Sequence, residues 1–451
     1  MYETFSENLI RLANACPYPL YVVGGRVRDY LAGLNAAVTD TDICAPASAE
    51  DFINRAKDCN FSVVAAYKNT GTVKISLEDE AYEFTCFRSD EYVRGEHVPA
   101  NIYFTEDINA DARRRDFKCN AVYYDIKNRR VVDPLGGVDD INDKRLDTVA
   151  PPRKVFGEDG LRLMRLARIA AQTGFLPTEE CLNAAREHCE LIRDVSVERV
   201  AAELHLILHA DERYGVNLAH YAGLKILKDT GVLNILLPEL CEGEVLEQRK
   251  DFHKYDVLEH SLRCVAYADG DVRLAALLHD VGKPYCFKVS NTFYGHEEAG
   301  AKIAENICVR LKLPKKLTEE TVRLIALHMY DFRCDAGENK VRKFIVKNID
   351  IFRKILSIKQ ADFAACRDSN AVAPSVVKMK NIYEKMLGEG VPFTLRELKI
   401  KGDNLLEMGF PPAEVGVTLE KLLLDCAIRQ VENDLEKLAV RARKVYLNSV
   451  K

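Results

Sequence analysis

The chain has 451 residues and a mass of 50.9 kDa, a length that predicts about three domains of roughly 150 residues each. Apolar residues make up 47% and charged residues 29% of it, which excludes disordered and fibrous proteins. No apolar run reaches the roughly 18 residues of a membrane span, and the N-terminus lacks the pattern of a signal peptide. The 14 cysteines form no CxxC pair, which predicts reduced thiols and a cytoplasmic location.

The net charge is −5, so the chain as a whole is not a polycation. Basic residues nevertheless gather in a short stretch between positions 113 and 168. A solvated, salt-bridged surface is one interpretation of such a stretch, and a cleft that faces phosphate groups is the other. The density of basic runs favours the cleft. The runs are Arg113-Arg114-Arg115, Lys127 with Arg129-Arg130, Lys144-Arg145, Arg153-Lys154, and Arg162 with Arg165 and Arg168.

The first third of the chain alternates strand-like and helix-like segments, which predicts an α/β head with a mixed or antiparallel sheet over residues 1–150. From Pro151-Pro152 onward strand patterns vanish, and amphipathic helical patterns continue to the C-terminus. Within this helical part we expect boundaries near 245 and 370, with a connector over 372–393. The predicted strands are 20–23, 61–66, 71–77, 82–87, 121–125 and 130–132, and a helix is predicted over 26–32.

The strongest chemical signal is the segment YVVGGRVRD, followed ten residues later by DTD. Gly24 and Gly25 stand where a strand turns into a helix, so backbone N–H groups can approach an anion without a Cβ in the way. Arg28 lies on the first turn of that helix and can add a guanidinium to a phosphate. The turn therefore predicts a phosphate-binding site.

Two carboxylates follow the glycine turn. Asp40 and Asp42 flank Thr41, and on an extended backbone residues i and i+2 share a face. Because like charges repel at close range, the pair favours a divalent cation, although a cap or an Asx-turn is the alternative for an isolated Asp-x-Asp. Glu83, on the polar face of a predicted strand, is either a third carboxylate of this site or a solvent-facing side chain.

These segments resemble the nucleotidyltransferase signature of the class II tRNA nucleotidyltransferase and bacterial poly(A) polymerase superfamily. The resemblance covers residues 20 to about 435, and further motifs follow in the order of that family. One of them departs from the family pattern, because Pro411-Pro412-Ala413 replaces its Pro-Gly-Pro. The motifs are RRDFKCNA (114–121), DPLGGVDD (133–140), FGEDGLRLMRLAR (156–168), ERVAAE (198–203) and ELKIKGDNLLEMGFPPAEVG (397–416).

The resemblance implies a reaction in which the 3′-hydroxyl of a primer attacks the α-phosphorus of a nucleoside triphosphate and pyrophosphate leaves. It implies that Asp40 and Asp42 hold two metal ions, for which Mg²⁺ is expected, and Glu83 stays a candidate third carboxylate.

The resemblance also implies which residues bind the nucleotide. Gly24, Gly25 and Arg28 are expected to bind the phosphates. Arg115 is expected to contact the triphosphate or the sugar, and Asn120 to bond the ribose.

Base selection is expected on the FGEDGLRLMRLAR helix. Asp159 and Arg162 are neighbours at i and i+3, so they can offer an acceptor and a donor fork to cytosine or adenine. Arg165 and Arg168 fall further round the helix and suit phosphates better. The alternative is a set of intrahelical ion pairs from Glu158 and Asp159 to Arg162.

The product follows from two further segments. RSDEYVRGEHVP (88–99) resembles the flexible loop of enzymes that complete CCA. Poly(A) polymerases of the group carry Gly-Arg-Arg-Phe after their carboxylate pair, where this chain has SVVAAYKNTGTVKI (62–75). We therefore expect addition of CCA to the 3′ end of tRNA from CTP and ATP.

A second constellation lies in the helical part. LAALLHDVGKP (274–284), with YDVLEHSL before it and YGHEEAG after it, resembles the HD phosphohydrolase signature. The resemblance implies one divalent metal, such as Mn²⁺, Ni²⁺, Co²⁺ or Zn²⁺, and a possible second position. The domain then either hydrolyses phosphoesters on RNA ends or serves as a scaffold that helps hold tRNA. The first metal would be held by His260, His279, Asp280 and Asp362, and the second by His296 and His328.

Four domains are therefore expected: a catalytic head (1–150), a neck for RNA and base recognition (151–245), an HD domain (246–370) and a tRNA-binding tail (371–451). The expected partners are tRNA, ATP and CTP, with no membrane and no obligate protein partner. The alternatives are a poly(A) polymerase, a metal phosphohydrolase whose head has become a sensor, and a non-catalytic RNA-binding scaffold. The intact carboxylates and glycine turn argue against the scaffold.

Overall fold

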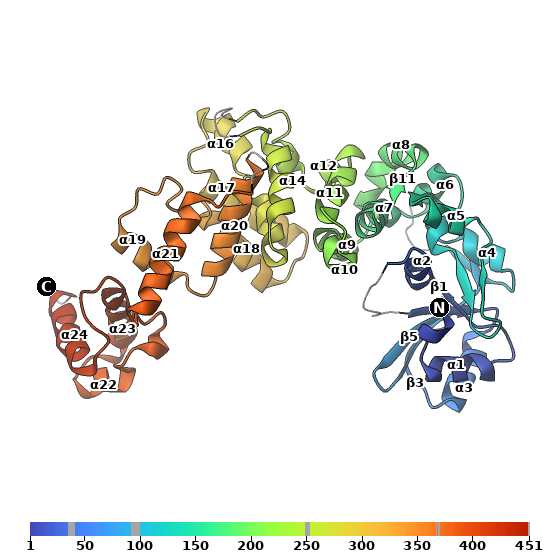
Figure 1. The fold of residues 1–451 in the computed structure, drawn as a ribbon, viewed down its shortest axis with the longest axis horizontal. Helices are drawn as coiled ribbons and strands as arrows, with labels where there is room; N and C mark the ends of the chain where they lie inside the picture. Colours follow the sequence, from blue (N-terminus) through green and yellow to red (C-terminus); the bar gives the residue numbers. More distant parts are fainter. Residues whose placement is uncertain (35–40, 92–99, 249–252, 367, 369, 450–451) are drawn as a thin grey trace. The chain divides into compact units, whose positions relative to one another are not determined.

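The computed structural model describes residues 1–34, 41–91, 100–248, 253–366, 368 and 370–449 (Figure 1). The chain divides into two compact units, Met1–Cys241 with Arg310–Lys312, and Glu242–Val309 with Leu313–Lys451. Asp40 and most of the 88–99 segment lie outside the described residues. In the part of the chain that is described, no helix combines the length and apolar character that a membrane crossing requires.

The first unit begins with a seven-stranded sheet in the order β3-β4-β5-β2-β1-β8-β9. The β2/β5 pair is parallel and the other pairs are antiparallel, so the expected mixed sheet is confirmed. Sequence patterns did not predict β2, nor the separate β6–β7 hairpin. The strands are β1 (Tyr21–Val23), β2 (Thr41–Ala45), β3 (Ser62–Tyr67), β4 (Thr72–Leu77), β5 (Glu80–Cys86), β6 (Arg88–Glu91), β7 (Asn101–Phe104), β8 (Tyr123–Asp125) and β9 (Arg130–Val132).

Alternation along the strands decides which side chains face the core of the head. In β5, Phe84 is fully buried and stacks on Phe52 of α3 at a centroid distance of 3.7 Å, while the neighbouring Glu83 is only half-buried. In β2, Ile43 is buried and Asp42 is exposed. The apolar residues thus fix the strand faces that carry the carboxylates. The head helices are α1 (Glu7–Ala15), α2 (Gly25–Leu31), α3 (Ala49–Asp58), α4 (Ile108–Arg113) and α5 (Gly137–Asn142).

The chain after the sheet is mostly helical, as expected. It differs from the prediction in two places: a short strand lies beyond residue 151, and the helix expected over 156–168 is interrupted. A parallel pair of two-residue strands, β10 (Arg145–Leu146) and β11 (Leu176–Pro177), places a strand beyond residue 151. The predicted continuous helix is wrong, because the backbone of Asp159 is extended (φ −145°, ψ 109°) and divides it into two. The helices are α6 (Pro152–Glu158), α7 (Leu161–Thr173), α8 (Glu179–His188), α9 (Val197–Leu208), α10 (Ala210–Tyr214), α11 (Ala219–Asp229), α12 (Val232–Leu236) and α13 (Pro238–Cys241).

The described residues from Glu242 onward contain helices and turns and no strand. The connector predicted over 372–393 is wrong, because most of it forms α21. Pro374 occupies the first turn of that helix, where a missing N–H is tolerated, and Met379 and Met386 bury its apolar face. The helices are α14 (Val257–Tyr267), α15 (Arg273–Leu278), α16 (Lys283–Ser290), α17 (His296–Arg310), α18 (Lys315–Leu327), α19 (Glu338–Lys347), α20 (Phe352–Ala365), α21 (Pro374–Gly388), α22 (Gly402–Glu407), α23 (Pro412–Ala427) and α24 (Leu435–Ser449).

Candidate functional site

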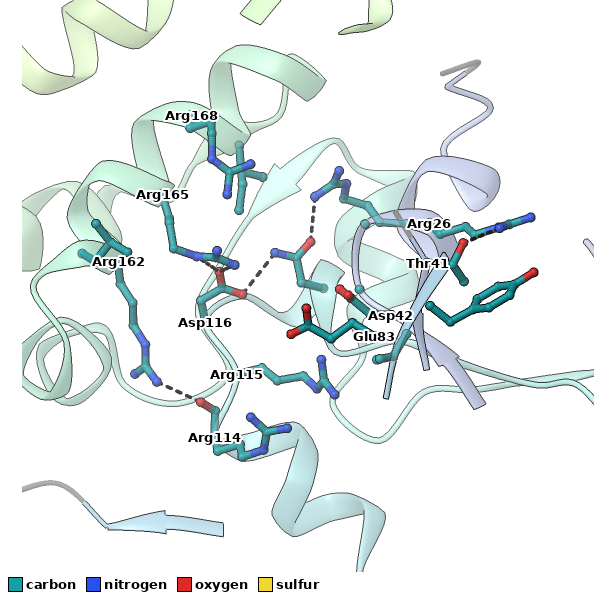
Figure 2. A pocket seen from close by; sticks show the side chains of 18 of the residues that line it. Arg26, Thr41, Asp42, Glu83, Arg114, Arg115, Asp116, Arg162, Arg165 and Arg168 are labelled. Carbon is teal, nitrogen blue, oxygen red and sulfur yellow. Dashed lines mark hydrogen bonds and ion pairs between the residues drawn. The ribbon is translucent and has the colours of Figure 1, made fainter. Parts of the chain in front are cut away.

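A pocket of about 670 Å³ in the first unit is lined by the ends of β1 and β2, by β4 and β5, and by helices that follow the sheet (Figure 2). Apart from Asp40, which lies outside the described residues, every head and neck residue proposed from the sequence lines this pocket. These residues are Gly24, Gly25, Arg28, Asp42, Glu83, Arg115, Asn120, Asp159, Arg162, Arg165 and Arg168.

Two carboxylates face each other across neighbouring strands at the pocket. Asp42 and Glu83 are register partners in the parallel β2/β5 pair, and Figure 2 shows both carboxylates pointing into the same space. The glycine turn packs closely against the first of them, since a Cβ at Gly24 would lie 3.3 Å from Asp42 Oδ2. Gly24 also has φ +80°, a conformation that other residues adopt only with strain. The geometry thus brings a carboxylate pair and a glycine turn together.

Glu83 has a second neighbour. Lys74 of β4 lies 3.0 Å from Glu83 Oε2, and both side chains are about half exposed, 50% and 45%. Glu83 is therefore solvent-facing and also part of the pocket wall, so the two interpretations of this residue are compatible. Lys74 compensates part of the negative charge that two adjacent carboxylates create.

A buried polar network joins the glycine turn to α7. Arg28 pairs with Asp29 at 2.6 Å and donates to Asn120 Oδ1 at 2.7 Å. Asn120 donates in turn to Asp116, whose other oxygen accepts from Arg165 Nε at 2.7 Å. Burial alone would raise the pKa of Asp116, but the Arg165 guanidinium holds it well below its usual range. These contacts fix two guanidiniums and one amide at the pocket wall before any ligand arrives.

Arg115 is held in the same manner on another wall. Its guanidinium lies 2.9 Å from Asp111 Oδ2 and over the ring of Tyr123, with a centroid distance of 5.2 Å. The Tyr123 hydroxyl donates to the same carboxylate at 2.7 Å. Burial raises the pKa of Asp111, but Arg115 and Arg114 lower it to about 2. The carboxylate is therefore charged, and it orients Arg115 toward the pocket.

The proposed base-reading pair has a different local structure from the one expected. Asp159 stands at the junction of α6 and α7, and its carboxylate accepts from the N–H of Leu161, the first residue of α7, at 2.9 Å. Arg162 is buried, and it pairs with Glu158 at 2.9 Å and donates to the Arg114 carbonyl at 2.8 Å (Figure 2). Asp159 therefore does not share a helix with Arg162, although the Arg162 N–H donates to the Asp159 carbonyl at 3.0 Å and both residues line the pocket.

Sequence analysis gave no individual site role to five cationic residues of the pocket wall, although Arg114 belongs to a basic run that was expected to face phosphate groups. Arg26 donates to Thr41 and lies next to the glycine turn, a position that could have indicated it. Arg199 belongs to the ERVAAE segment and lies 3.9 Å from Asp159. Nothing in the local sequence of Arg213 indicated a pocket residue. The set is Arg26, Lys74, Arg114, Arg199 and Arg213.

A second cluster lies in the second unit, where residues from α14, α20 and the ends of α15 and α18 meet. His260 Nε2 is 3.0 Å from Asp362 Oδ1 and 3.3 Å from His279 Nε2. His279 Nε2 is 3.2 Å from Asp280 Oδ2. These four residues are the ones that the sequence proposed for a first HD metal. They lie far apart in the sequence, and the structure brings them together.

The residues proposed for a second metal lie on the other side of Asp280. His296 Nε2 is 3.3 Å from Asp280 Oδ1 and 3.4 Å from His328 Nε2. The two oxygens of Asp280 therefore face the two histidine groups. Sequence analysis missed three neighbours of the cluster: Lys283, which pairs with Asp280 at 2.6 Å, and His253 and Cys366, which lie 3.5 Å apart beside His260.

The donor set fits a cation, as the ring orientations indicate. Three of the histidines place Nδ1 within 2.6 to 2.8 Å of a main-chain carbonyl. A carbonyl only accepts, so Nδ1 carries the proton and Nε2 keeps a lone pair for a metal. Burial lowers the pKa of His328 to about 3, so that ring is neutral. The three pairs are His279 with Ala276, His296 with Phe293, and His328 with Ile325.

Comparison with known proteins places both regions. Residues 20–147 match the poly(A) polymerase head domain, residues 174–243 a domain described as the probable RNA and SrmB-binding site of polymerase A, and residues 253–354 the HD domain. An A-adding tRNA nucleotidyltransferase of Deinococcus radiodurans is 30% identical over 370 residues, 78% of each chain. A CCA-adding enzyme of Geobacillus thermodenitrificans is 30% identical over 309 residues, 66% of this chain and 68% of that protein.

Other curated relatives match over shorter stretches. The CCA-adding enzyme of Staphylococcus epidermidis is 34% identical over 191 residues, so this chain spans about half of its length, 46%. Among solved structures, the Bacillus stearothermophilus CCA-adding enzyme in complex with CTP has a TM-score of 0.66 at 22% identity, covering 98% of this chain and 100% of that one. At that identity the structural likeness speaks for the fold.

The fold and the pocket define a nucleotidyltransferase with an additional HD domain. The matched segments and the D. radiodurans relative then make the family plain: this chain belongs to the tRNA nucleotidyltransferase and poly(A) polymerase family. Membership implies a divalent cation, and the described residues contain groups able to hold one.

Proposed function

We propose that this chain adds cytidine, cytidine and adenosine to the 3′ end of tRNA from CTP and ATP, without a nucleic-acid template. The observation that carries the proposal is the Asp42–Glu83 carboxylate pair beside the Gly24–Gly25 turn, in a pocket rich in arginine. The A-adding and CCA-adding enzymes among its relatives support the same chemistry.

Asp40 and Asp42 would hold Mg²⁺, and Glu83 is the candidate third carboxylate. When bound there, the cations lower the pKa of the primer hydroxyl and neutralise the triphosphate. The protein's own part is to bind and orient the nucleotide. Gly24 and Gly25 leave room for phosphate oxygens, and Arg28 offers a guanidinium beside them that Asp29 already holds in place.

The remaining pocket residues would orient the nucleoside. Arg115 faces the sugar and phosphates from the Asp111 side, and Asn120 is within reach of the ribose. Asp159 and Arg162 would read the base edge, with Arg162 exchanging its contact to Glu158 for one to the base. Arg165 and Arg168 would contact phosphates.

A narrower activity, addition of the terminal adenosine alone, is favoured by one observation. The A-adding relative matches over 78% of each chain, whereas the G. thermodenitrificans CCA-adding enzyme matches over 66% of this chain at the same 30% identity. If a second enzyme supplied the two cytidines, this chain would accept tRNA that already ends in CC.

Three substrates separate these activities: tRNA lacking its last three nucleotides, tRNA ending in C, and tRNA ending in CC. Each is incubated with Mg²⁺ and with CTP and ATP singly and together. Addition of C, C and A to the shortest tRNA, followed by a stop, supports the proposal. Extension of only the CC-ended tRNA, by ATP alone, would replace it with A addition, and a long A tail would indicate a poly(A) polymerase.

We also propose that the HD cluster binds a divalent metal such as Mn²⁺, Ni²⁺, Co²⁺ or Zn²⁺, with His260, His279, Asp280 and Asp362 as one ligand set. Burial would raise the pKa of Asp280, but His279 and Lys283 keep it well below its usual range, so the carboxylate is charged. Phosphoester hydrolysis at RNA ends is the activity such a centre would supply. Metal content after dialysis against each ion, followed by assay on 2′,3′-cyclic AMP, tests both points.

The helical parts would serve RNA binding. The neck carries the segment 174–243 that matches an RNA-binding domain family, which supports contact with tRNA there, and the tail after 371 would extend it. All 14 cysteines are free thiols, which favours a cytoplasmic location. Retention of tRNA by the full chain in a gel-shift assay, with and without Mg²⁺, tests the RNA contact.

A further inference from the structure

The short helix α10 (Ala210–Tyr214) ends beside the nucleotide pocket. Its last two residues, Arg213 and Tyr214, have no role in the function proposed above. Tyr214 donates its hydroxyl hydrogen to Asp29 Oδ2 and accepts from Arg28 Nη2 at 3.3 Å. Arg213 lines the pocket, and its guanidinium lies 3.9 Å from the same carboxylate oxygen. A segment 185 residues along the chain thus closes on α2.

Arg28 and Asp29, the partners of these contacts, lie next to the glycine turn. A Cβ at Gly25 would lie 3.5 Å from Arg28 Nη2 and 3.9 Å from Asp29 Oδ2. Arg213 approaches that same Oδ2 oxygen. The Arg213 guanidinium therefore lies near the glycine turn, where backbone N–H groups and Arg28 would bind phosphate.

The charge of Arg213 is compensated less than that of six other pocket arginines, although Arg199 pairs with Asp159 at the same 3.9 Å. Those six pair with a carboxylate at 2.9 Å or closer, whereas Arg213 reaches Asp29 only at 3.9 Å. Asp29 is also already engaged by Arg28 and Tyr214. The Arg213 side chain is 39% exposed, so an anionic ligand can reach it. The six are Arg28, Arg114, Arg115, Arg162, Arg165 and Arg168.

We propose that Arg213 is a further phosphate-binding residue for the β- and γ-phosphates of the incoming nucleotide, and that Tyr214 is a positioning residue that fixes Asp29, and through it Arg28, for the same phosphates. The proposal rests on the proposed nucleotidyltransferase function. It gives α10 a direct share in triphosphate binding, in addition to the phosphate contacts expected of Arg165 and Arg168 on α7.

Binding of CTP and CMP, measured by calorimetry on the full chain with Mg²⁺, tests the role of Arg213. In Arg213→Ala the dissociation constant for CTP should rise about tenfold and that for CMP by less than about twofold, because a charged hydrogen bond to the outer phosphates is lost. Arg213→Lys should lie between, since it keeps the charge without the fork. Equal losses for CTP and CMP, or none, would overturn the assignment.

Arg193→Ala is the matched control. It removes the same charge from an exposed ion pair with Glu190 in the same unit, outside the pocket lining, so CTP binding should stay at the wild-type value. A wild-type chain that fails to bind CTP would contradict the proposed function itself. Wild-type CTP binding together with an unaffected Arg213→Ala contradicts only the present inference.

Tyr214→Phe tests the positioning role, because it deletes one hydroxyl and keeps the ring. If the hydroxyl fixes Arg28 for ground state and transition state alike, KM for CTP should rise about threefold to tenfold while kcat stays nearly constant. A merely structural role would instead lower kcat through loss of folded protein and leave KM unchanged. That result would overturn the role given to Tyr214.

Discussion

Two regions of this chain gather titratable side chains, and they balance charge in opposite ways. Among the described residues, nine arginines and one lysine line the pocket of the first unit together with four carboxylates, and most of the guanidiniums are fixed by carboxylates at short distance. In the HD cluster, three histidines place Nε2 within 3.3 Å of one of two aspartates, Asp280 and Asp362. The pocket is suited to a polyanion, and the cluster is suited to a cation. The two sites are therefore expected to respond independently to substitution.

Removal of the two aspartates that follow the glycine turn should abolish the function of the pocket and leave the HD cluster unaffected. In Asp40→Ala/Asp42→Ala, nucleotide addition should fall by at least roughly 1,000-fold, because the cations that stabilise the transition state lose their ligands. Incorporation of labelled CMP into tRNA lacking CCA measures this, and metal content of the HD cluster should not change. Activity within tenfold of the wild type would contradict the metal assignment.

Removal of His279 should have the opposite effect: the HD cluster loses its function and the pocket keeps its own. His279→Ala should lose the metal of the HD cluster and any phosphohydrolase activity, while nucleotide addition is kept. Metal analysis after dialysis and the two activity assays, run on one preparation, give the answer. His188→Ala serves as control, since that imidazole bonds to a carbonyl of its own helix, Ala184, at 2.9 Å and lies outside the HD cluster. Loss of both activities in His279→Ala would mean that the function of the pocket depends on the HD cluster.

A substitution in the glycine turn should have a smaller effect on nucleotide addition, and it tests the role of that turn. Gly24→Ala combines left-handed backbone strain with a contact 3.3 Å from Asp42 Oδ2, so nucleotide addition should fall roughly tenfold to 100-fold. Gly33→Ala is the matched control, because Gly33 also has a positive φ, +66°, but a Cβ there would meet nothing within 4 Å. Both variants should lose similar thermal stability. Equal losses of activity would contradict a specific role for Gly24.

The smallest expected effect concerns pH. Burial raises the pKa of Asp111, but Arg115 and Arg114 lower it to about 2, below the value of an unfolded chain. A depressed carboxyl pKa stabilises the fold above pH 4 and loses that contribution as pH falls toward 2. Between pH 5 and pH 3 this group should cost about 1 kcal/mol of the free energy of unfolding.

Urea unfolding at both pH values measures this cost. The acid-induced loss should be smaller by that amount in Asp111→Asn, whatever the overall stability of the variant. An identical acid-induced loss in the two proteins would show that Asp111 is not held charged by its arginines.

Much of the head could be predicted from local sequence. The runs around Val22, Val73 and Phe84 alternate or are β-branched, so they indicated strands that the structure contains. β2 was missed as a strand because its five residues begin with the polar Thr41 and Asp42 and form no apolar or alternating run of strand length, although the two-residue spacing was used for Asp42. The helix through Asp159 was wrong because the contact of its carboxylate with the Leu161 N–H competes with helical hydrogen bonds, a choice that the sequence pattern does not reveal.

The sequence by itself determined the chemistry: a glycine turn, carboxylates two residues apart and the His and His-Asp residues are short motifs whose function depends on residue type and near spacing. Only the tertiary structure decided which distant residues meet them. Strand register set Glu83 beside Asp42, and the packing of α10 set Arg213 and Tyr214 beside Asp29. Such pairings depend on how buried apolar faces dock, and local sequence does not encode that docking.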